Sequence, residues 1–345
     1  MLSVARVEKI IYLISILLSK MINRSKNPAT LNPKRILVIR LDEIGDLCYT
    51  LPALQLLRNR YPEAKITLWC RPFAGSLVRC HPAIDVIVHH VSELKNRFDL
   101  VVDMRGKWAG IAYAITHRTF FRLERGSVRL RNRLRGKHPH ETETNIEIIA
   151  PVLGTNPTAP LPQIFPSPAD EEAGQRFIDG DIQGPFVVMH TLARRELRMW
   201  GADNFETIAN WLHREKNLEI VFCGDKNDNE YIGKMMSRLD FRTFSIAGNH
   251  SLGAFAAIVS KASLFIGNES GPLHIASVSG TPSLGLYGPG EPFIFYPKGR
   301  KTAWIHHVLP CNPCDQIHCK FSDNPCIRRI TVEQVKAKCE ELLAP

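Results

Sequence analysis

The sequence lacks several patterns that would assign a common class of protein. No Gly-x-Gly-x-x-Gly pattern follows an apolar run, and no Gly-x4-Gly-Lys-Ser/Thr pattern is present, which disfavours nicotinamide enzymes and P-loop enzymes. No His-Glu-x-x-His pattern is present either. The nine cysteines in 345 residues are too few and too unevenly spaced for a secreted disulfide scaffold. We therefore expect a cytosolic enzyme, with four of the cysteines as small core residues: Cys48, Cys70, Cys80 and Cys223.

The sequence also lacks an apolar run of the roughly 20 residues that span a bilayer. The run at 10–18 is shorter, and no small-x-small cleavage site follows it, which disfavours a signal peptide. Apolar residues recur there at helical spacing, between Arg and Lys residues: Val7, Ile10, Ile11, Ile14, Leu17, Leu18 and Met21. This pattern predicts a helix lying on an anionic membrane surface. A helix that packs on the body of the protein is the open alternative.

Basic residues exceed acidic ones, with 44 Lys and Arg against 34 Asp and Glu and a pI near 9.2. This excess indicates an anionic partner, such as a membrane, a polyphosphate, an acidic glycan or a nucleic acid. Residues 118–137 contain eight basic residues and one acid. We interpret them as a loop for an acidic, partly lipidic acceptor, with Arg118 and Arg122 as contacts; a merely solvated loop is the alternative. The aromatic residues cluster near apolar strands rather than over one basic face, which disfavours a nucleic-acid partner.

Short β-branched runs alternate with helical segments twice along the chain. Strands are expected at 35–41, 65–70, 83–89 and 99–103, and again at 186–189, 219–223, 244–246 and 264–266. Five prolines in 156–168 mark a boundary between the two halves. The predicted fold class is α/β, with two doubly wound parallel sheets. The predicted divisions are a helix and linker at 1–30, domains at 31–165 and 166–330, and a C-terminal helix at 331–345.

The most informative segment, 265–289, has the pattern of a strand, a tight turn, a short helix and a second strand. Ser270 and Gly271 occupy the expected helix N-cap, and Pro272 stands in the first turn, where a missing N–H has no cost. The free N–H groups and the helix dipole there favour an anion. His274 could add a donor. We interpret the segment as a phosphate site; an ordinary strand–helix connection is the alternative.

A carboxylate follows the first strand, in a loop that also contains Gly45. Asp46 is a candidate general base for an acceptor hydroxyl, and Gly45 would let the acceptor come close. The alternative is that Asp46 only caps the next helix. At the carboxyl end of the strand at 186–189, a second loop offers phosphate contacts: Thr191, Arg194, Arg195 and Arg198. Asp228 could accept a hydrogen bond from a ribose hydroxyl; the alternative, more common for such an acid, is a solvated loop residue.

Four cysteines fall within sixteen residues near the C-terminus: Cys311, Cys314, Cys319 and Cys326. Four thiolates could hold zinc or an iron–sulfur centre, but the spacing is not that of a common zinc ribbon. Structural packing is the alternative, and no metal is expected in the reaction.

Five segments are similar, in order and spacing, to those of one family: residues 36–54, 98–106, 246–252, 268–276 and 286–289. The first contains Ile-Arg-Leu-Asp-Glu-Ile-Gly-Asp, and the fourth reads Asn-Glu-Ser-Gly-Pro-Leu-His-Ile-Ala. Together they resemble the bacterial lipopolysaccharide heptosyltransferases, glycosyltransferase family 9. The four-cysteine pattern also occurs in many members. The resemblance covers roughly residues 34–344.

This resemblance implies a GT-B fold, with two Rossmann-like domains facing a cleft. It implies inverting, metal-independent and cofactor-free transfer from a nucleotide-sugar donor, usually ADP-heptose, to a lipopolysaccharide inner core. It also implies a cytoplasmic enzyme, peripheral on the inner face of the bacterial inner membrane. A GT-B nucleotide-sugar epimerase and a non-enzymatic polyanion-binding protein are the alternatives.

The family's functional residues fall on positions identified above. Its catalytic aspartate falls on Asp46, and its phosphate-binding turn on Ser270, Gly271 and His274. Its basic donor-loop residue falls on Arg198, where better-studied members have Lys. The acid before Ser-Gly falls on Glu269, where the family usually has Asp. These two departures leave the donor open.

Overall fold

The structure is a computed structural model, and it describes residues 4–344 except residues 25, 96, 106, 118, 119 and 315. The chain divides into two units, Met1–Pro162 and Gln163–Pro345. The division falls inside the proline-rich segment at 156–168. Each unit is built around its own parallel sheet.

The sheet of unit 1 has the strand order β3-β2-β1-β4-β5, and all neighbouring strands are parallel. Its strands are β1 (Arg35–Arg40), β2 (Lys65–Cys70), β3 (Val86–Val88), β4 (Leu100–Arg105) and β5 (Phe121–Glu124). The central β1 has no exposed surface from Ile36 to Ile39, as expected for a strand covered on both faces. The chain winds from β1 to one side and then, with β4, to the other. The boundary between β1 and β4 is therefore the topological switch point of this sheet.

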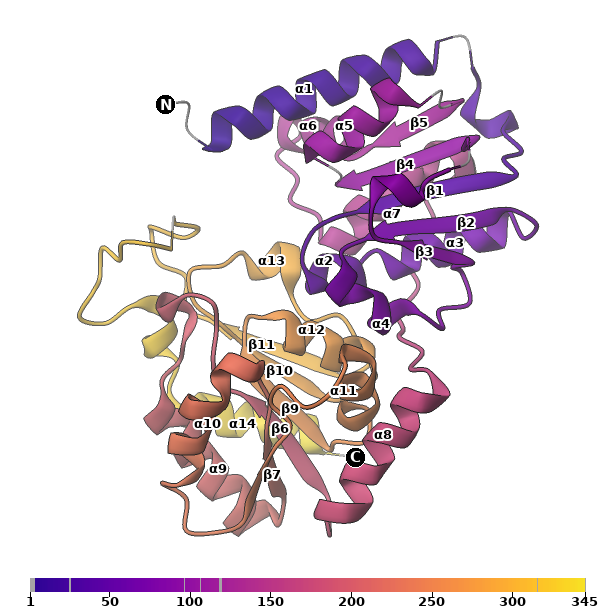
Figure 1. Cartoon of the computed structure of the whole chain (residues 1–345). Coiled ribbons are helices and arrows are strands. Elements are labelled where there is room, and N and C mark those ends of the chain that lie inside the picture. Colours follow the sequence, from indigo (N-terminus) through magenta and orange to yellow (C-terminus); the bar gives the residue numbers. More distant parts are fainter. Residues whose placement is uncertain are drawn as a thin grey trace. The chain divides into compact units, whose positions relative to one another are not determined.

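The helices of unit 1 connect and cover these strands (Figure 1). They are α1 (Val4–Ile22), α2 (Ile44–Cys48), α3 (Leu51–Arg60), α4 (Gly75–Val78), α5 (Lys107–Thr116), α6 (Arg125–Leu134) and α7 (Glu141–Leu153), with single 3₁₀ turns at Pro28–Thr30, Pro72–Ala74 and Val91–Glu93. Figure 1 shows α1 lying beside the edge strand β5, together with α5 and α6, and α1 contacts all three elements. It therefore covers an edge that would otherwise present unpaired backbone groups.

The interpretation of residues 118–137 as a basic loop is wrong for most of that segment. Residues 121–134 form β5 and α6. Glu124 caps α6 by accepting a hydrogen bond from the backbone N–H of Ser127 (2.9 Å). Arg122 lies on β5 and is fully buried, and its guanidinium donates to Asp103 and to Ser15 and Ser19 of α1. This placement does not fit a contact with an acceptor, so Arg122 is a structural residue that attaches α1. Arg118 lies outside the described residues.

The sheet of unit 2 has the order β11-β10-β9-β6-β7-β8 and is also parallel throughout. Its strands are β6 (Phe186–His190), β7 (Glu219–Phe222), β8 (Thr243–Ser245), β9 (Leu264–Asn268), β10 (Ser283–Tyr287) and β11 (Thr302–His306). Here the switch point lies between β6 and β9, because β7 and β8 extend to one side of β6 and β9 begins the other.

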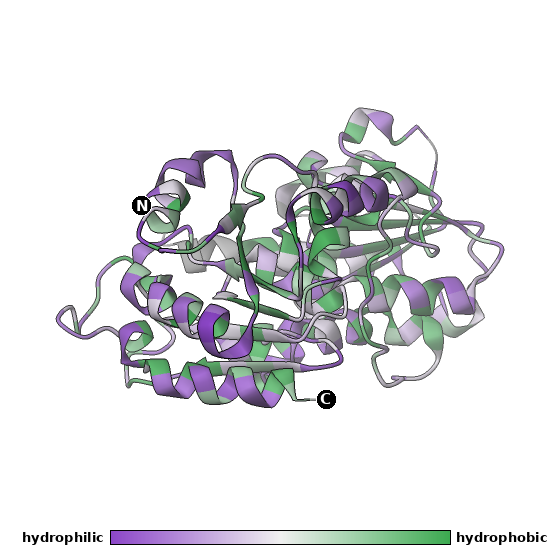
Figure 2. Ribbon diagram, turned by 90° about the horizontal axis from the view of Figure 1, so that it is seen from below, coloured by the Kyte–Doolittle hydropathy of each residue, from purple (hydrophilic) through white to green (hydrophobic). Residues whose placement is uncertain are grey.

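The helices of unit 2 are α8 (Pro168–Asp181), α9 (Ala202–Lys216), α10 (Asn229–Met236), α11 (Leu252–Val259), α12 (Gly271–Val278), α13 (Pro292–Phe295) and α14 (Val332–Leu343), with 3₁₀ turns at Glu196–Arg198, Lys226–Asp228 and Cys326–Arg329. The strands are mostly coloured as hydrophobic and several helices carry bands of both colours (Figure 2). Trp200 is fully buried in the core, and its indole N–H donates to the carbonyl of Ile330 (2.8 Å). That bond joins the loop after β6 to the segment just before α14.

None of the described helices is both long and apolar enough to cross a bilayer. Helix α1 packs on the body of unit 1, as the alternative interpretation held. Among its described side chains, the two that are buried are polar, Ser15 and Ser19, whereas five large apolar side chains of the helix remain exposed: Ile10, Leu13, Ile14, Leu17 and Met21.

Candidate functional site

Asp46 lies on α2, directly after the carboxyl end of β1 and thus at the switch point of unit 1. Its carboxylate is mostly buried, with 11% of the side chain exposed. One oxygen, Oδ1, accepts a hydrogen bond of 2.9 Å from Nη2 of Arg40, the last residue of β1. A charge-assisted bond from a fully buried guanidinium fixes the direction of the carboxylate. This arrangement suits a residue that must meet a substrate hydroxyl in one orientation.

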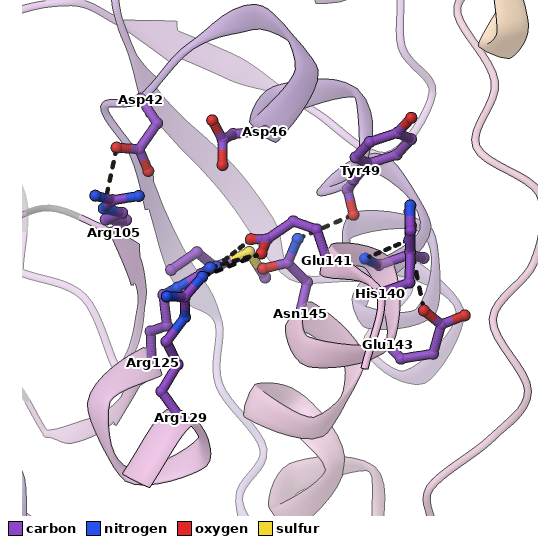
Figure 3. Close-up of polar contacts among 12 residues, drawn as sticks. Asp42, Asp46, Tyr49, Arg105, Arg125, Arg129, His140, Glu141, Glu143 and Asn145 are labelled. Carbon is purple, nitrogen blue, oxygen red and sulfur yellow. Dashed lines mark hydrogen bonds and ion pairs between the residues drawn. The ribbon is translucent and has the colours of Figure 1, made fainter. Parts of the chain in front are cut away.

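Arg40 also contacts a second carboxylate, that of Glu141 on α7. Arg40 Nη2 lies 2.7 Å from Glu141 Oε1, and Arg125 of α6 forms two hydrogen bonds to the same carboxylate. Figure 3 shows Arg125 and Arg129 reaching Glu141 from one side, close to Asp46. Arg40, Arg125 and Glu141 are almost completely buried, whereas the side chain of Arg129 is partly exposed. The guanidinium groups lower the pKa of Glu141 against the opposing effect of its burial, so it stays ionised.

Asp42 forms a second pair next to Arg40. Its carboxylate lies 3.3 Å from Nε of Arg105 at the end of β4 and 3.8 Å from Nε of Arg40. Burial raises the pKa of Asp42, while the two arginines oppose that rise. The sequence predicted the carboxylate of Asp46, but not the nearby Asp42 or the partners Arg40, Arg105 and Glu141. Only the register of β1 with β4 and the position of α7 bring these residues together.

In unit 2, the start of α12 lies at the carboxyl end of β9, next to β6. Ser270 is the N-cap in extended conformation, but its hydroxyl makes no capping bond. It lies 3.0 Å from Nδ1 of His190, the last residue of β6. Burial lowers the pKa of His190 to about 4, so the imidazole is neutral near pH 7. The first N–H groups of α12 are therefore not occupied by a side-chain cap, which leaves them for an anion.

The loop after β6 is fixed by Asn268, a residue for which the sequence predicted no role. Asn268 Nδ2 donates to the carbonyl of Thr191 (2.8 Å), and its Oδ1 accepts from the backbone N–H of Trp200 (3.1 Å). Thr191 is 1% exposed, and its hydroxyl has no hydrogen-bond partner among the described residues. An unpaired buried hydroxyl costs stability, so it indicates a ligand.

Arg198 and Glu269 meet beside this turn. Arg198 Nη1 lies 3.6 Å from Glu269 Oε2, and Arg198 Nε donates to Gln316 (2.7 Å). Burial raises the pKa of Glu269, and Arg198 opposes the rise. Glu269 Oε2 accepts no hydrogen bond from the described residues. Sequence analysis placed both residues in the donor site, and the structure brings them together.

The other residues predicted to contact the donor lie in different environments. His274 lies on α12 and is buried, and Gly271 is the first residue of that helix. Arg194 and Arg195 are exposed in the loop. Asp228 Oδ2 accepts from the backbone N–H of Asp225 (2.7 Å), so the residue caps its own turn. Gly45 lies beside Asp46 on α2 and is buried.

The four clustered cysteines line one pocket of about 410 Å³ with Leu197 and several prolines. Within the described part of the chain, no group of three or more His, Cys, Asp or Glu residues is arranged to hold a metal ion. Of the four expected core cysteines, Cys48, Cys70 and Cys223 are buried, but Cys80 is exposed, which corrects that prediction.

Comparison with known proteins now decides the family. Residues 87–324 match the sequence model described as glycosyltransferase family 9 (heptosyltransferase). The chain belongs to this family. It is a glycosyltransferase, as the resemblance implied, and the alternatives of an epimerase and a polyanion-binding protein are weaker.

Relatives of known name cover most of the chain. The lipopolysaccharide core heptosyltransferase OpsX of Haemophilus influenzae is 24% identical over 282 residues, which are 75% of this chain and 80% of that protein. Lipopolysaccharide heptosyltransferase 2 of Escherichia coli is 22% identical over 308 residues, 79% of this chain and 88% of that protein.

Solved structures share the fold. The family 9 glycosyltransferase from Veillonella parvula superposes with a TM-score of 0.79 at 22% identity, covering 90% of this chain and 97% of that one. The ADP-heptose lipopolysaccharide heptosyltransferase II of E. coli gives 0.71 at 19% identity, covering 90% and 98%. The two doubly wound units are thus those of a GT-B glycosyltransferase, which confirms the predicted fold class.

Proposed function

We propose that this glycosyltransferase moves a heptose from ADP-heptose to an inner-core acceptor of lipopolysaccharide, with inversion and without a metal ion. The names of its relatives support the donor and the acceptor class, since they are described as lipopolysaccharide heptosyltransferases and one solved relative as an ADP-heptose enzyme. The observation that carries the proposal is the pairing of Asp46 with Arg40 at the switch point of unit 1.

In this proposal Asp46 acts as the general base. Its carboxylate accepts the proton of the acceptor hydroxyl as that oxygen attacks the anomeric carbon from the face opposite the leaving diphosphate. Arg40 orients the carboxylate through Oδ1, and Gly45 leaves room beside it for the acceptor. Single displacement of this kind inverts the anomeric configuration.

The donor site of the proposal is the start of α12 with the loop after β6. The N–H groups of Ser270 and Gly271, the hydroxyl of Thr191 and the guanidinium of Arg198 would hold the diphosphate and stabilise the charge that develops as it leaves. These donors replace the role of Mg²⁺. Arg194 and His274 add further contacts in this proposal.

Glu269 would accept a hydrogen bond from a hydroxyl of the sugar at Oε2, which accepts none from the described residues. Asp228 remains a proposed contact for a ribose hydroxyl through its second oxygen, because Oδ2 caps its own turn. The acceptor is lipid-linked, so the enzyme would work as a peripheral protein on the cytoplasmic face of the inner membrane.

The experiment that tests the proposal compares ADP-heptose with UDP- and GDP-sugars at equal concentration. We expect ADP-heptose to raise the Tm most and to release ADP only when a heptose-deficient lipopolysaccharide core is added. Nucleotide release at the same rate without acceptor would instead favour an epimerase or a hydrolase. Equal transfer from a UDP-sugar would contradict the proposed donor.

A further inference from the structure

Helix α1 turns a polar stripe toward the protein and an apolar stripe outward, and Ile11, Ile16, Leu18 and Ile22 are half-buried between the two stripes. The inward residues are Tyr12, Ser15, Ser19 and Asn23, spaced by three or four positions. Arg122 Nη1 donates to the carbonyl of Ser15 (3.0 Å) and Nη2 to its hydroxyl (3.0 Å). The side chain of Asn23 donates a hydrogen bond to the carbonyl of Arg122 (2.6 Å) and accepts one from its backbone N–H (2.8 Å).

The outward residues follow the same spacing on the opposite side: Ile10, Leu13, Ile14, Leu17 and Met21. At about 100° per residue, the two stripes are centred roughly 180° apart around the helix. Leu13 is 55% exposed, Leu17 61% and Met21 75%. The helices α5 and α6, which α1 contacts, and Phe120 just before β5 add further exposed apolar side chains, those of Ile115, Phe120, Leu130 and Leu134.

The buried side of α1 is held rigidly, because Arg122 is itself fixed by Asp103 at 2.5 Å, and both side chains are almost fully buried. The helix therefore cannot roll to bury its apolar stripe without breaking the hydrogen bonds of the buried Arg122 to Ser15 and Ser19, which is costly in the interior. A contiguous apolar surface kept outward in this way marks an interaction site.

The charge around the stripe indicates what covers it. No acidic residue occurs between Glu8 and Asp42, and Lys20 and Arg24 are exposed at the end of the helix. The exposed end of α6 and the turn after it add Arg131, Arg133, Arg135 and Lys137. An apolar stripe bordered by cations fits the interface of an anionic bilayer, where apolar side chains enter the acyl boundary and cations meet the headgroups.

We propose that the outward stripe of α1 is the surface by which this enzyme docks on an anionic lipid bilayer. This deepens the proposed function and rests on it in one respect, since a lipid-linked acceptor requires an enzyme at the membrane. The stripe enters the interface, and the bonds of Arg122 to Ser15 and Ser19 hold unit 1 in one orientation to the bilayer.

Flotation of the full-length protein with vesicles tests this proposal, without donor or acceptor. With vesicles of phosphatidylethanolamine and phosphatidylglycerol, we expect the parent protein to float. The double variant Leu13→Ser/Leu17→Ser should bind at least about tenfold more weakly, because each buried apolar side chain contributes to partitioning. The double variant Lys20→Glu/Arg24→Glu should also bind about tenfold more weakly, and the parent should bind less well in high salt.

The matched control is Val91→Ser/Val308→Ser, which removes two apolar side chains that are 47% and 64% exposed elsewhere. We expect it to float like the parent. Since all these positions are exposed, the variants should keep the parent's Tm and donor affinity, which shows that they are folded.

Two results would overturn the proposal. One is equal flotation of the Leu13/Leu17 variant and the parent, or no flotation of either. The other is a lipid-free dimer, seen by light scattering, that this variant converts to a monomer without any change in vesicle binding; the stripe would then join two copies of the chain. If vesicle binding follows the prediction but no heptose is transferred, the proposed function fails and the docking surface stands.

Discussion

At the scale of single residues, charge burial in unit 1 is the most consequential feature. Glu141 has no exposed surface and is shared between Arg40 and Arg125. Removing one member of such a cluster leaves a buried charge without compensation, which costs about 3–5 kcal/mol. The cluster therefore couples the stability of unit 1 to the position of Asp46.

We predict that Glu141→Gln lowers the free energy of unfolding by about 3–5 kcal/mol and also lowers kcat, with a smaller effect on donor affinity. The reason is that Arg40 then loses the partner that fixes its contact with Asp46. Urea denaturation and steady-state kinetics measure the two effects. The control is Glu147→Gln, which removes an ion pair with Arg131 that is partly exposed. Equal behaviour of the two variants would contradict the prediction.

A second prediction concerns the unpaired hydroxyl of Thr191. Thr191→Val should leave the unliganded protein equally stable or up to about 1 kcal/mol more stable, because no hydrogen bond is lost. Its affinity for ADP should fall about tenfold, because one hydrogen bond to a charged group is lost. Titration calorimetry and thermal unfolding check both, and Thr191→Ser should retain the parent's ADP affinity. An unchanged affinity in Thr191→Val would remove the residue from the donor site.

The neutral imidazole of His190 predicts a pH effect. Its pKa falls from 6.5 to about 4 on folding, so the unfolded chain binds more protons between these values and stability falls as the pH drops through this window. The contribution is complete above about pH 6.5 and declines by roughly 1 kcal/mol between pH 7.5 and 5.5. His190→Asn should reduce this acid sensitivity by that amount in urea denaturation at the two pH values. An unaltered pH dependence would show that His190 is not the group responsible.

At the scale of elements, local sequence patterns predicted the buried central strands but not the strand β5. The central strands β1, β2, β6 and β9 fall where their β-branched runs indicated, since each is buried on both faces. The strand β5 was missed because only four residues form it and a run of basic residues surrounds it. Asp103 neutralises the charge of Arg122 on this strand, and α1 also contacts that side chain. Both partners are distant in sequence, so no local pattern predicts them.

The candidate site divides in the same way. The turn at Ser270 and the carboxylate at Asp46 follow strands directly, so strand order and the switch-point rule could find them. Arg40, Glu141 and Asn268 act through contacts with residues up to about a hundred positions away, which depend on register and helix placement. The face that α1 turns outward could not be predicted either, because helical spacing indicates an apolar face but not which face the protein covers.

The attachment of α1 gives a prediction at this scale. Arg122→Met removes the buried ion pair with Asp103 and the hydrogen bonds to Ser15 and Ser19, so we expect a loss of about 3 kcal/mol and faster amide exchange along α1. Hydrogen exchange followed by mass spectrometry measures both. Arg131→Met, which removes a partly exposed pair, should change stability by no more than about 1 kcal/mol. Unaltered exchange in Arg122→Met would mean that other contacts hold the helix.

At the scale of the whole molecule, the two units carry complementary chemistry. Unit 1 presents an oriented carboxylate at its switch point, and unit 2 presents N–H groups, a hydroxyl and a guanidinium at its own. Both arrangements follow from the same winding of a parallel sheet, which gathers the loops at the carboxyl ends of the strands. In the proposed function, the fold thus supplies an acid–base group and an anion site by repetition.

Because the proposed anion site uses protein donors, transfer should not require a divalent ion. We predict the same kcat/KM in excess EDTA as in Mg²⁺, measured as ADP release with acceptor present. Loss of activity in EDTA that Mg²⁺ restores would contradict the assignment of charge stabilisation to Arg198 and the start of α12.

The central claim, that Asp46 is the base for glycosyl transfer, is tested most directly by Asp46→Asn. Asparagine keeps an oxygen for Arg40 but cannot accept the acceptor proton. We predict that single-turnover transfer of heptose from ADP-heptose falls by about 10²–10⁴-fold while the Kd for the donor stays within about threefold. Transfer at a rate within about threefold of the parent enzyme would contradict the claim.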